Sequence, residues 1–321
     1  MQYLPRGANF QRSKTLWEIG LHIAGDPSEP YTGNRDMCIA VGSASGDTFK
    51  PYLRMSTGSP IVAHAVVAGD IEMAFVNPSG ALTQAYRGKG LFDTPLPVRV
   101  VCSYPSWDRF VVMVHPRTGI RSLADLKDRR GPLRISIRED PTHSTRVLTD
   151  QLLPLYGLSL HDLESRGATF EGVGPPSDER RLNGLRAGEI DLCMDEGIPS
   201  GWLDTALENG MVPITLEDEI FKQLQDIGWR RVVIPADRFR GLKEDHACID
   251  YSGWPLYTRE SLPDEIAYRV CDALNARSEH VPWEVSYTGI GQTGQDTEAT
   301  PIDVPLHSGA ARWYREHGFI K

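Results

Sequence analysis

The chain of 321 residues contains little cysteine, and its five cysteines stand far apart. They are Cys38, Cys102, Cys193, Cys248 and Cys271, and none of them forms a Cys-x-x-Cys pair. An odd number of scattered thiols does not indicate a disulfide framework. It fits a reducing compartment, in which these residues serve as small buried apolar side chains.

Long hydrophobic runs are also missing. No stretch of about 18 apolar residues occurs, so no membrane-spanning helix is predicted. The first 25 residues are polar and lack both the apolar segment and the small-residue cleavage site of a signal peptide. We therefore expect a cytoplasmic protein, with the periplasm as the alternative if the sequence has been trimmed.

Positive charge is in deficit, since the net charge is −9 and the isoelectric point is about 5.5. An acidic chain is a poor partner for nucleic acid or for an anionic membrane. We therefore expect neither nucleic acid as a partner nor insertion into a membrane. A homo-oligomer is left open.

Several motifs of catalysis and cofactor binding are absent. The sequence has no His-Glu-x-x-His, no EF-hand spacing, no Gly-x-Ser-x-Gly elbow and no Gly-x-Gly-x-x-Gly loop opening a βαβ unit. We therefore expect neither a metal nor a cofactor.

The stretch from Thr57 to Gly80, TGSPIVAHAVVAGDIEMAFVNPSG, organises the rest of the chain. Ser59 suits a helix N-cap, and the apolar residues 61–68 predict a buried helix that stops at Gly69. Residues 71–76 predict an internal strand, and a loop follows at its carboxyl end.

This pattern returns about 120 residues later. The heptapeptide Ala68 to Ala74 is matched by Ala187 to Cys193, and each copy leads into Pro-Ser-Gly. Because two copies are too few for a solenoid, the repeat predicts two lobes of like construction.

Three segments of the sequence resemble the TAXI family of TRAP-transporter solute-binding proteins. They are Ser56 to Ser59 with the helix and strand that follow, Gly119 to Lys127, and Pro305 to Ala310 with Trp313 to Gly318. The resemblance covers roughly residues 37 to 321. It implies a two-lobed receptor whose ligand lies in a cleft and whose lobes close about a hinge.

The predicted fold class is α/β, with a two-lobed, type II periplasmic-binding-protein-like fold and a central ligand cleft. We expect lobe 1 to comprise residues 1–104 and 258–321, and lobe 2 to comprise 115–246. The segments 105–114 and 247–257 are the predicted hinge crossings, because both contain extended apolar runs.

The candidate site follows from the rule that open α/β sheets bind ligands at the carboxyl ends of their strands. On one wall we place Ser43, Ser45, Ser59, Asn77 and Ser79, and on the other Thr142, His143, Ser144, Glu196 and Ser200. Tyr104, Trp107 and Trp254 lie near the predicted hinge. Arg109 and Arg138 are candidates for a carboxylate clamp.

Two functions stay open on these residues. The first is a binding protein that holds a small organic acid without chemistry. The second is a cytoplasmic enzyme on the same fold, such as a decarboxylase or hydrolase of an aromatic or dicarboxylic acid. In that case His143 would carry the proton, because its unperturbed pKa lies near 6.5, and Glu196 would orient it.

Overall fold

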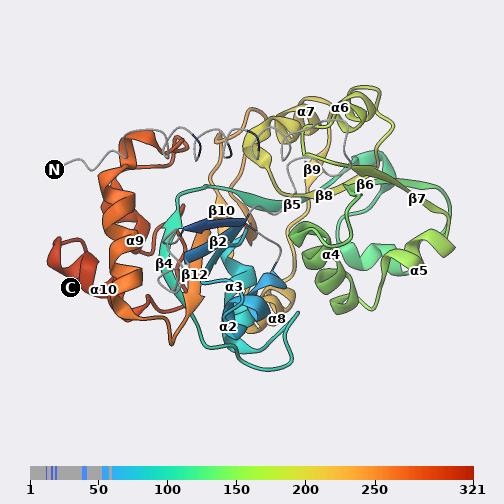
Figure 1. Ribbon diagram of the computed structural model, residues 1–321. Helices are drawn as coiled ribbons and strands as arrows, with labels where there is room; N and C mark the ends of the chain where they lie inside the picture. Colours follow the sequence, from blue (N-terminus) through green and yellow to red (C-terminus); the bar gives the residue numbers. More distant parts are fainter. Residues whose placement is uncertain (1–11, 13–15, 17–18, 20–37, 42–52, 58–59) are drawn as a thin grey trace. The chain divides into compact units, whose positions relative to one another are not determined.

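The computed structural model describes residues 12, 16, 19, 38–41, 53–57 and 60–321 of the chain (Figure 1). These residues form two compact units. Unit 1 comprises the described part of residues 1–76 together with 96–105 and 254–321, and unit 2 comprises 77–95 and 106–253.

Unit 1 is built on a five-stranded sheet with the order β1-β2-β3-β12-β4. Its strands are β1 (Cys38–Val41), β2 (Leu53–Thr57), β3 (Met73–Phe75), β4 (Val98–Tyr104) and β12 (Trp254–Arg259). Its helices are α2 (Val62–Ala68), α9 (Asp264–Ala276) and α10 (Ser308–Glu316), with short 3₁₀ turns at Ser278–His280 and Ile290–Gly294. Apolar residues of α9 and α10, among them Cys271 and Trp313, pack with Val101 and Leu256 of the sheet.

Unit 2 is built on a second sheet, with the order β10-β11-β5-β8-β6-β7 and β9 paired to β5. Its strands are β5 (Arg109–Val114), β6 (Leu133–Arg138), β7 (Ala168–Val173), β8 (Leu192–Asp195), β9 (Val212–Pro213), β10 (Arg231–Ile234) and β11 (His246–Asp250). Its helices are α3 (Ser79–Arg87), α4 (Ser144–Leu155), α5 (Leu160–Ser165), α6 (Glu179–Arg186), α7 (Trp202–Glu208) and α8 (Asp218–Ile227), with 3₁₀ turns at Pro116–Thr118, Leu123–Lys127 and Ile198–Ser200.

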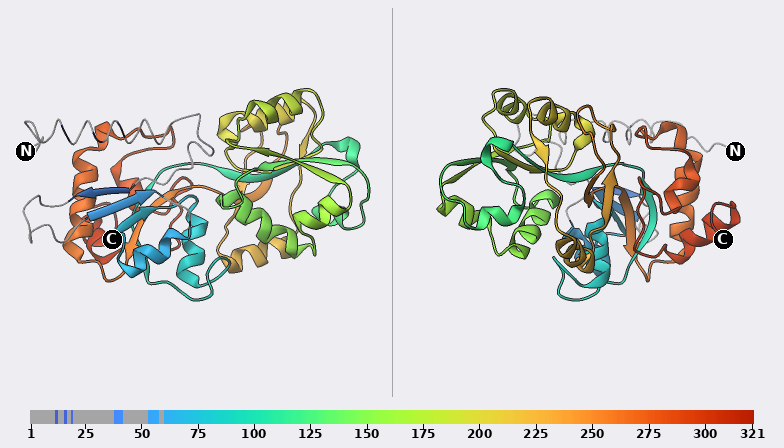
Figure 2. Two further views of the ribbon diagram at one scale, coloured as in Figure 1. Left: turned by 45° about the vertical axis from the view of Figure 1, so that its right-hand side comes forward. Right: turned by 180° about the vertical axis from the view of Figure 1, so that it is seen from behind.

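Both faces of the unit 2 sheet are buried, and β5 explains why. Phe110 and Val112 belong to one apolar cluster and Val111 and Met113 to the other, as the two-residue period of a strand requires. Helices α4 and α5 cover the first face, and α6 and α7 cover the second (Figure 2). Each unit therefore has its own sheet, and the predicted α/β class is confirmed.

The internal repeat is a structural repeat. In unit 1 the backbone N–H of Arg54 on β2 donates to Glu72, and in unit 2 that of Arg134 on β6 donates to Asp191. Glu72 and Asp191 hold the same place in the two copies and return a backbone hydrogen bond to the carbonyl of the same arginine. Each copy thus ties its strand to the parallel neighbour in the same way.

Two local predictions around the first copy are wrong. Helix α2 buries only Ala63 and Val66, and Ile61 is 71% exposed, because only one face of the helix packs on the sheet. Residues 79 and 80 do not continue a loop but begin α3. In α3 the Cα of Gly80 lies so close to the indole of Trp229 that a Cβ would be 2.7 Å from it.

The unit to which helix α3 belongs also differs from the predicted division of the chain into lobes. Residues 77–95 were expected in lobe 1, but they group with unit 2, since α3 packs on Trp229 and Gln84 lies 3.3 Å from Gln151. Two further boundaries between the units fall at 105/106 and 253/254. They lie within the segments 105–114 and 247–257, which the sequence predicts as hinges. Hinge motion itself stays a prediction.

Candidate functional site

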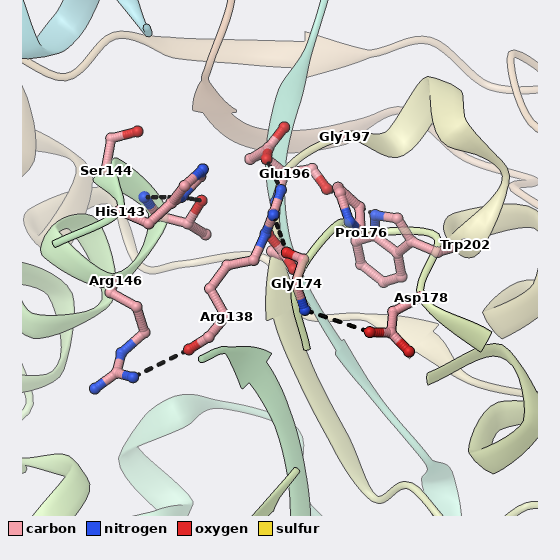
Figure 3. Close-up of polar contacts among 12 residues, drawn as sticks. Arg138, His143, Ser144, Arg146, Gly174, Pro176, Asp178, Glu196, Gly197 and Trp202 are labelled. Atoms are coloured by element: carbon pink, nitrogen blue, oxygen red, sulfur yellow. Dashed lines mark hydrogen bonds and ion pairs between the residues drawn. The ribbon is translucent and has the colours of Figure 1, made fainter. Parts of the chain in front are cut away.

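The carboxyl ends of the parallel strands β6 and β8 bring charged groups to one edge of the unit 2 sheet. Arg138 ends β6 and Asp195 ends β8, and Nε of Arg138 lies 3.0 Å from Oδ1 of Asp195. The same guanidinium also donates to the carboxylate of Glu196 and to the carbonyl of Gly174 (Figure 3). These acceptors replace the water that burial has removed from Arg138.

Helix α6 supplies a second buried cation to the same edge. Nη1 of Arg181 lies 2.5 Å from Oδ2 of Asp195, and its Nε donates to Oγ of Ser136 at 2.9 Å. Arg181 and Asp195 are both 0% exposed. Burial alone would raise the pKa of Asp195, but Arg181 and Arg138 lower it, so this carboxylate stays ionised.

Glu196 and Asp108 form the acidic side of this cluster. Burial raises the pKa of Glu196 against the opposing effect of Arg138. Burial, and then the charge of Glu196, raises the pKa of Asp108 well above its usual range, although Asp108 accepts from the backbone N–H of Gly197 at 2.8 Å. The negative charge of Glu196 thus disfavours ionisation of Asp108, while Arg138 offsets the burial of Glu196.

Both candidates for the carboxylate clamp form ion pairs within the chain. Arg138 is paired as described, and Arg109 is 1% exposed with its Nη1 2.9 Å from Oδ1 of Asp250. Arg109 also donates to the carbonyl of Asp108 at 2.8 Å. Both guanidiniums thus face carboxylates of the chain itself, and their role as a clamp for a ligand stays a prediction.

His143 is held by the helix that it begins. It is the N-cap of α4, and its Nδ1 accepts from the backbone N–H of Thr145 at 3.2 Å and contacts the Thr145 hydroxyl at 2.8 Å. Burial, and then the charge of Arg138, lowers the pKa of His143 to about 4. The imidazole is therefore neutral at pH 7, and an accepting Nδ1 assigns its proton to Nε2.

The hydroxyl of Ser144 is used inside unit 2. It forms a hydrogen bond with the phenol of Tyr251, which also lies 3.2 Å from Oγ1 of Thr145. Tyr251 is fully buried and stacks on Trp229 with ring centroids 6.4 Å apart. Ser144 thus anchors the start of α4 through its side chain, and only its backbone remains for a ligand.

Two further predicted residues lie on the surface of unit 2. Thr142 is exposed, and its hydroxyl donates to Asp140 at 2.8 Å. Ser200 is exposed, and its hydroxyl donates to the carbonyl of Gly197 at 2.6 Å. Of the residues predicted on this wall, Thr142, His143 and Ser144 stand together at the start of α4, and Glu196 and Ser200 follow β8.

The remaining predicted residues are divided between the units. In unit 2, Trp107 stacks on Phe239, and the hydroxyl of Ser79 donates to the carbonyl of Ser252 at 3.0 Å. In unit 1, Tyr104 stacks on Trp254 with centroids 4.9 Å apart. Asn77 is half-buried. The candidates Ser43, Ser45 and Ser59 lie outside the described residues.

The proposed acid–base pair is not formed. The carboxyl group of Glu196 is engaged by Arg138 and Asp108 rather than by His143. A histidine with a pKa of about 4 is also a poor proton carrier at neutral pH, since almost none of it is protonated there.

The sequence analysis did not single out three members of this site. They are Asp108, Arg181 and Tyr251, each of which reaches the cluster from a different element. Arg181 lies on α6, the helix that precedes the second repeat copy. No motif or repeat in the sequence marks Asp108 or Tyr251.

The part of the chain that the structure describes lacks two other kinds of feature. Among residues 60–321 and the shorter described segments, no group of three His, Cys, Asp or Glu side chains could hold a metal ion. In the same part of the chain, no helix is long and apolar enough to cross a membrane.

Comparison with known proteins decides the family. The model of the NMT1-like family matches residues 44–318. The chain belongs to the NMT1-like family. This membership supports the predicted solute-binding class at a coarse level, while it does not identify the TAXI subgroup.

Solved structures resemble this NMT1-like protein only distantly. The periplasmic aliphatic sulphonate binding protein SsuA from Escherichia coli is 15% identical with a TM-score of 0.34, over 68% of this chain and 58% of that one. A Xanthomonas citri protein bound to a chloride ion is 14% identical with a TM-score of 0.36, over 80% and 78%. The alkanesulfonate-binding protein from Xanthomonas axonopodis pv. citri, bound to MOPS, is 14% identical with a TM-score of 0.29, over 80% and 70%. Likeness at this level assigns neither a ligand nor a residue role to this chain.

Proposed function

We propose that this NMT1-like protein is a solute receptor for a small organic acid and that the acid group binds at the start of α4. The observation that carries the proposal is the state of His143. Its imidazole is neutral and fixed by the N-cap, so that Nε2–H is a donor of constant direction. The positive end of the α4 dipole lies at the same place and favours an anionic oxygen.

The ion pair between Arg138 and Glu196 supports this assignment, because both groups lie beside the start of α4 and their opposite charges offset one another. Asp140 accepts from the backbone N–H of Thr142 in the same loop, so the helix terminus and the imidazole donor have to outweigh that carboxylate when an anion binds. Held in this way, the site is preorganised for binding, because few groups have to move when the ligand arrives.

The finer expectations of the sequence belong to the same proposal. As a receptor of the TAXI type, the protein would deliver its ligand to a membrane transporter, and this role suits the periplasm better than the cytoplasm. Cell fractionation with an antibody against the protein tests the compartment. Recovery in the cytoplasmic fraction alone would reject the receptor role.

A thermal-shift screen tests the ligand class. Each carboxylic acid is paired with its primary amide, and a series of sulfonates is measured beside them, since the compared proteins include sulfonate receptors. A bound acid at about 100 times its Kd stabilises the fold by roughly 2.7 kcal/mol. We expect stabilisation by acids and none by the matched amides. Equal shifts with acid and amide would reject an anion site.

A further inference from the structure

A series of hydroxyl groups ends on the imidazole of His143 at the start of α4, where Figure 3 shows His143 beside Ser144. Oγ1 of Thr145 lies 2.8 Å from Nδ1 of His143, and the phenol oxygen of Tyr251 lies 3.2 Å from the same Oγ1. The phenol also forms a hydrogen bond with the hydroxyl of Ser144. Three successive contacts therefore join three hydroxyl groups to one ring nitrogen.

These three hydroxyl groups, of Ser144, Tyr251 and Thr145, form a relay that is buried inside unit 2. Thr145 and Tyr251 are 0% exposed, and Ser144 is 7% exposed. Among the described residues, the hydroxyls of Ser144 and Tyr251 have no hydrogen-bond partner outside the relay. Each hydroxyl has a single hydrogen to donate, and burial requires that this hydrogen finds an acceptor inside the protein.

The number of hydrogens decides the direction of the relay. When Nδ1 accepts, Ser144 donates to Tyr251, Tyr251 donates to Thr145, and the last hydroxyl donates to Nδ1, so that every hydrogen is used. When Nδ1 carries the proton, each bond reverses, and the hydrogen of Ser144 has no acceptor among the described residues. The backbone N–H of Thr145, 3.2 Å from Nδ1, would then also face another N–H. Only an accepting Nδ1 satisfies all the donors.

We infer that Ser144, Tyr251 and Thr145 are positioning residues that fix the tautomer of His143 and make its Nε2 a hydrogen-bond donor. The inference rests on the proposed function, in which this N–H meets the acid group of the ligand. Burial and the charge of Arg138 lower the pKa of His143 to about 4, so the ring is neutral and its tautomer alone decides whether Nε2 donates or accepts. The relay thus selects an ionised acid, whereas the other tautomer would select an ammonium group.

Nitrogen-15 NMR of the full chain, labelled at histidine, reads the tautomer directly, because a protonated and an accepting ring nitrogen have different shifts. His143→Asn identifies the signals by removing them from the spectrum. We expect the wild type at pH 7 to carry a proton on Nε2 of His143 and none on Nδ1. A proton on Nδ1 in the wild type would overturn the inference.

Two substitutions at Thr145 test the last step of the relay. Thr145→Val removes the hydroxyl, and it should shift the ratio of the tautomers about threefold to tenfold towards Nδ1–H, which is the worth of one hydrogen bond. Thr145→Ser keeps the hydroxyl and should match the wild type. The control is Thr149→Val on the same helix, since the Thr149 hydroxyl is equally buried but donates to the carbonyl of Thr145 at 2.9 Å. It should leave the tautomer of His143 unchanged.

Tyr251→Phe tests the middle of the relay. It keeps the ring that stacks on Trp229 and removes the hydroxyl that donates to Thr145. The ratio of tautomers should shift in the same direction as in Thr145→Val but by a smaller factor, because Thr145 keeps its own hydroxyl. A wild-type ratio in Tyr251→Phe would remove Tyr251 from the relay, and equal ratios in Thr145→Val and Thr149→Val would reject the relay altogether.

The relay and the proposed function fail separately, because the NMR measurement needs no ligand. If the tautomers are as expected and no acid in the thermal-shift screen binds, the proposed function is wrong and the relay stands. If an acid binds while Nδ1 of His143 carries the proton, the relay is wrong. Circular dichroism and the Tm of each variant establish that the measured protein is folded.

Discussion

At the scale of single residues, the stability of unit 2 depends on buried charged side chains. Asp195 joins Arg138 and Arg181 at one edge of the sheet, and the three side chains are almost completely buried. Each guanidinium is tolerated there because a carboxylate is fixed beside it. The two arginines that the sequence suggests as a ligand clamp, Arg109 and Arg138, thus form buried ion pairs within unit 2.

The substitution Asp195→Asn tests this role. It leaves two buried guanidiniums with too little negative charge, and we expect a loss of about 3–5 kcal/mol in the free energy of unfolding. Urea titration measures it. The control is Glu189→Gln, which breaks the 2.5 Å pair with Arg134 at a site where Glu189 is 56% exposed, and should cost no more than about 0.5 kcal/mol. Comparable losses in the two variants would contradict the buried network.

A second prediction concerns acid and His246, which is 5% exposed and whose Nδ1 lies 3.2 Å from the hydroxyl of Thr215. Burial lowers the pKa of His246 to about 4. Between pH 6.5 and 4 the unfolded chain binds a proton there that the folded chain does not. Stability is therefore complete above pH 6.5 and falls as the pH drops towards 4, by up to about 1.4 kcal/mol per pH unit for this group.

The variant His246→Asn keeps an acceptor for Thr215 and removes the titrating ring. Its free energy of unfolding should depend less steeply on pH than that of the wild type between pH 6.5 and 4, and the two slopes should agree at higher pH. His161, which is exposed, provides the control His161→Asn. A slope unchanged by His246→Asn, or reduced as much by His161→Asn, would contradict the assignment.

At the scale of elements, histidine has a recurring role at helix starts. His143 begins α4 and His307 begins α10, and in both cases Nδ1 accepts a backbone N–H two residues later, at 3.2 Å. The two caps lie in different units. They make a natural pair for experiment, because the same substitution removes the same local bond at a proposed ligand site and away from it.

Helix α3 offers the sharpest packing test. Gly80→Ala gains about 1 kcal/mol of helix propensity, yet its Cβ would lie 2.7 Å from Cε3 of the buried Trp229. We expect a net destabilisation of roughly 1–3 kcal/mol, as for other overpacked cores. Gly174→Ala, whose Cβ would meet only Glu139 at 3.7 Å, is the control and should be nearly neutral. A neutral Gly80→Ala would mean that α3 does not pack on Trp229.

The elements of the first repeat copy could be predicted from the sequence, because their apolar residues are continuous. The helix predicted over residues 61–68 is α2 (Val62–Ala68), and the strand predicted over 71–76 is the shorter β3 (Met73–Phe75). Helix α3 was not predicted, for two reasons. Its buried residues include the polar Thr83 and Gln84, and the Pro-Ser-Gly sequence at its start is typical of a turn. The site was only partly predictable: the strand-end rule led to His143 and Glu196, but the pairing of Arg138 with Asp195 depends on the order of β6 and β8 in the sheet.

At the scale of the whole molecule, the repeat accounts for the two sheets. The same sequence pattern, Leu-Arg-x-Ser, occurs at 53–56 and 133–136. In each unit the backbone N–H of its arginine donates to the acidic residue of the repeat copy in that unit, Glu72 or Asp191. Each unit buries its own core, so each can support a site of its own. Membership of the NMT1-like family supports a solute-binding role, and the proposed site at α4 belongs to unit 2 alone.

One measurement tests this account most directly: the Kd of an acid from the thermal-shift screen for the wild type, His143→Asn and His307→Asn, by isothermal titration calorimetry at pH 7. Asparagine is a good N-cap, so α4 and α10 keep their starts and only the imidazole N–H is lost. We predict that His143→Asn weakens binding about tenfold, the worth of one hydrogen bond to an ionised group, and that His307→Asn binds like the wild type. Equal affinity of the wild type and His143→Asn, with both proteins folded, would contradict the central claim.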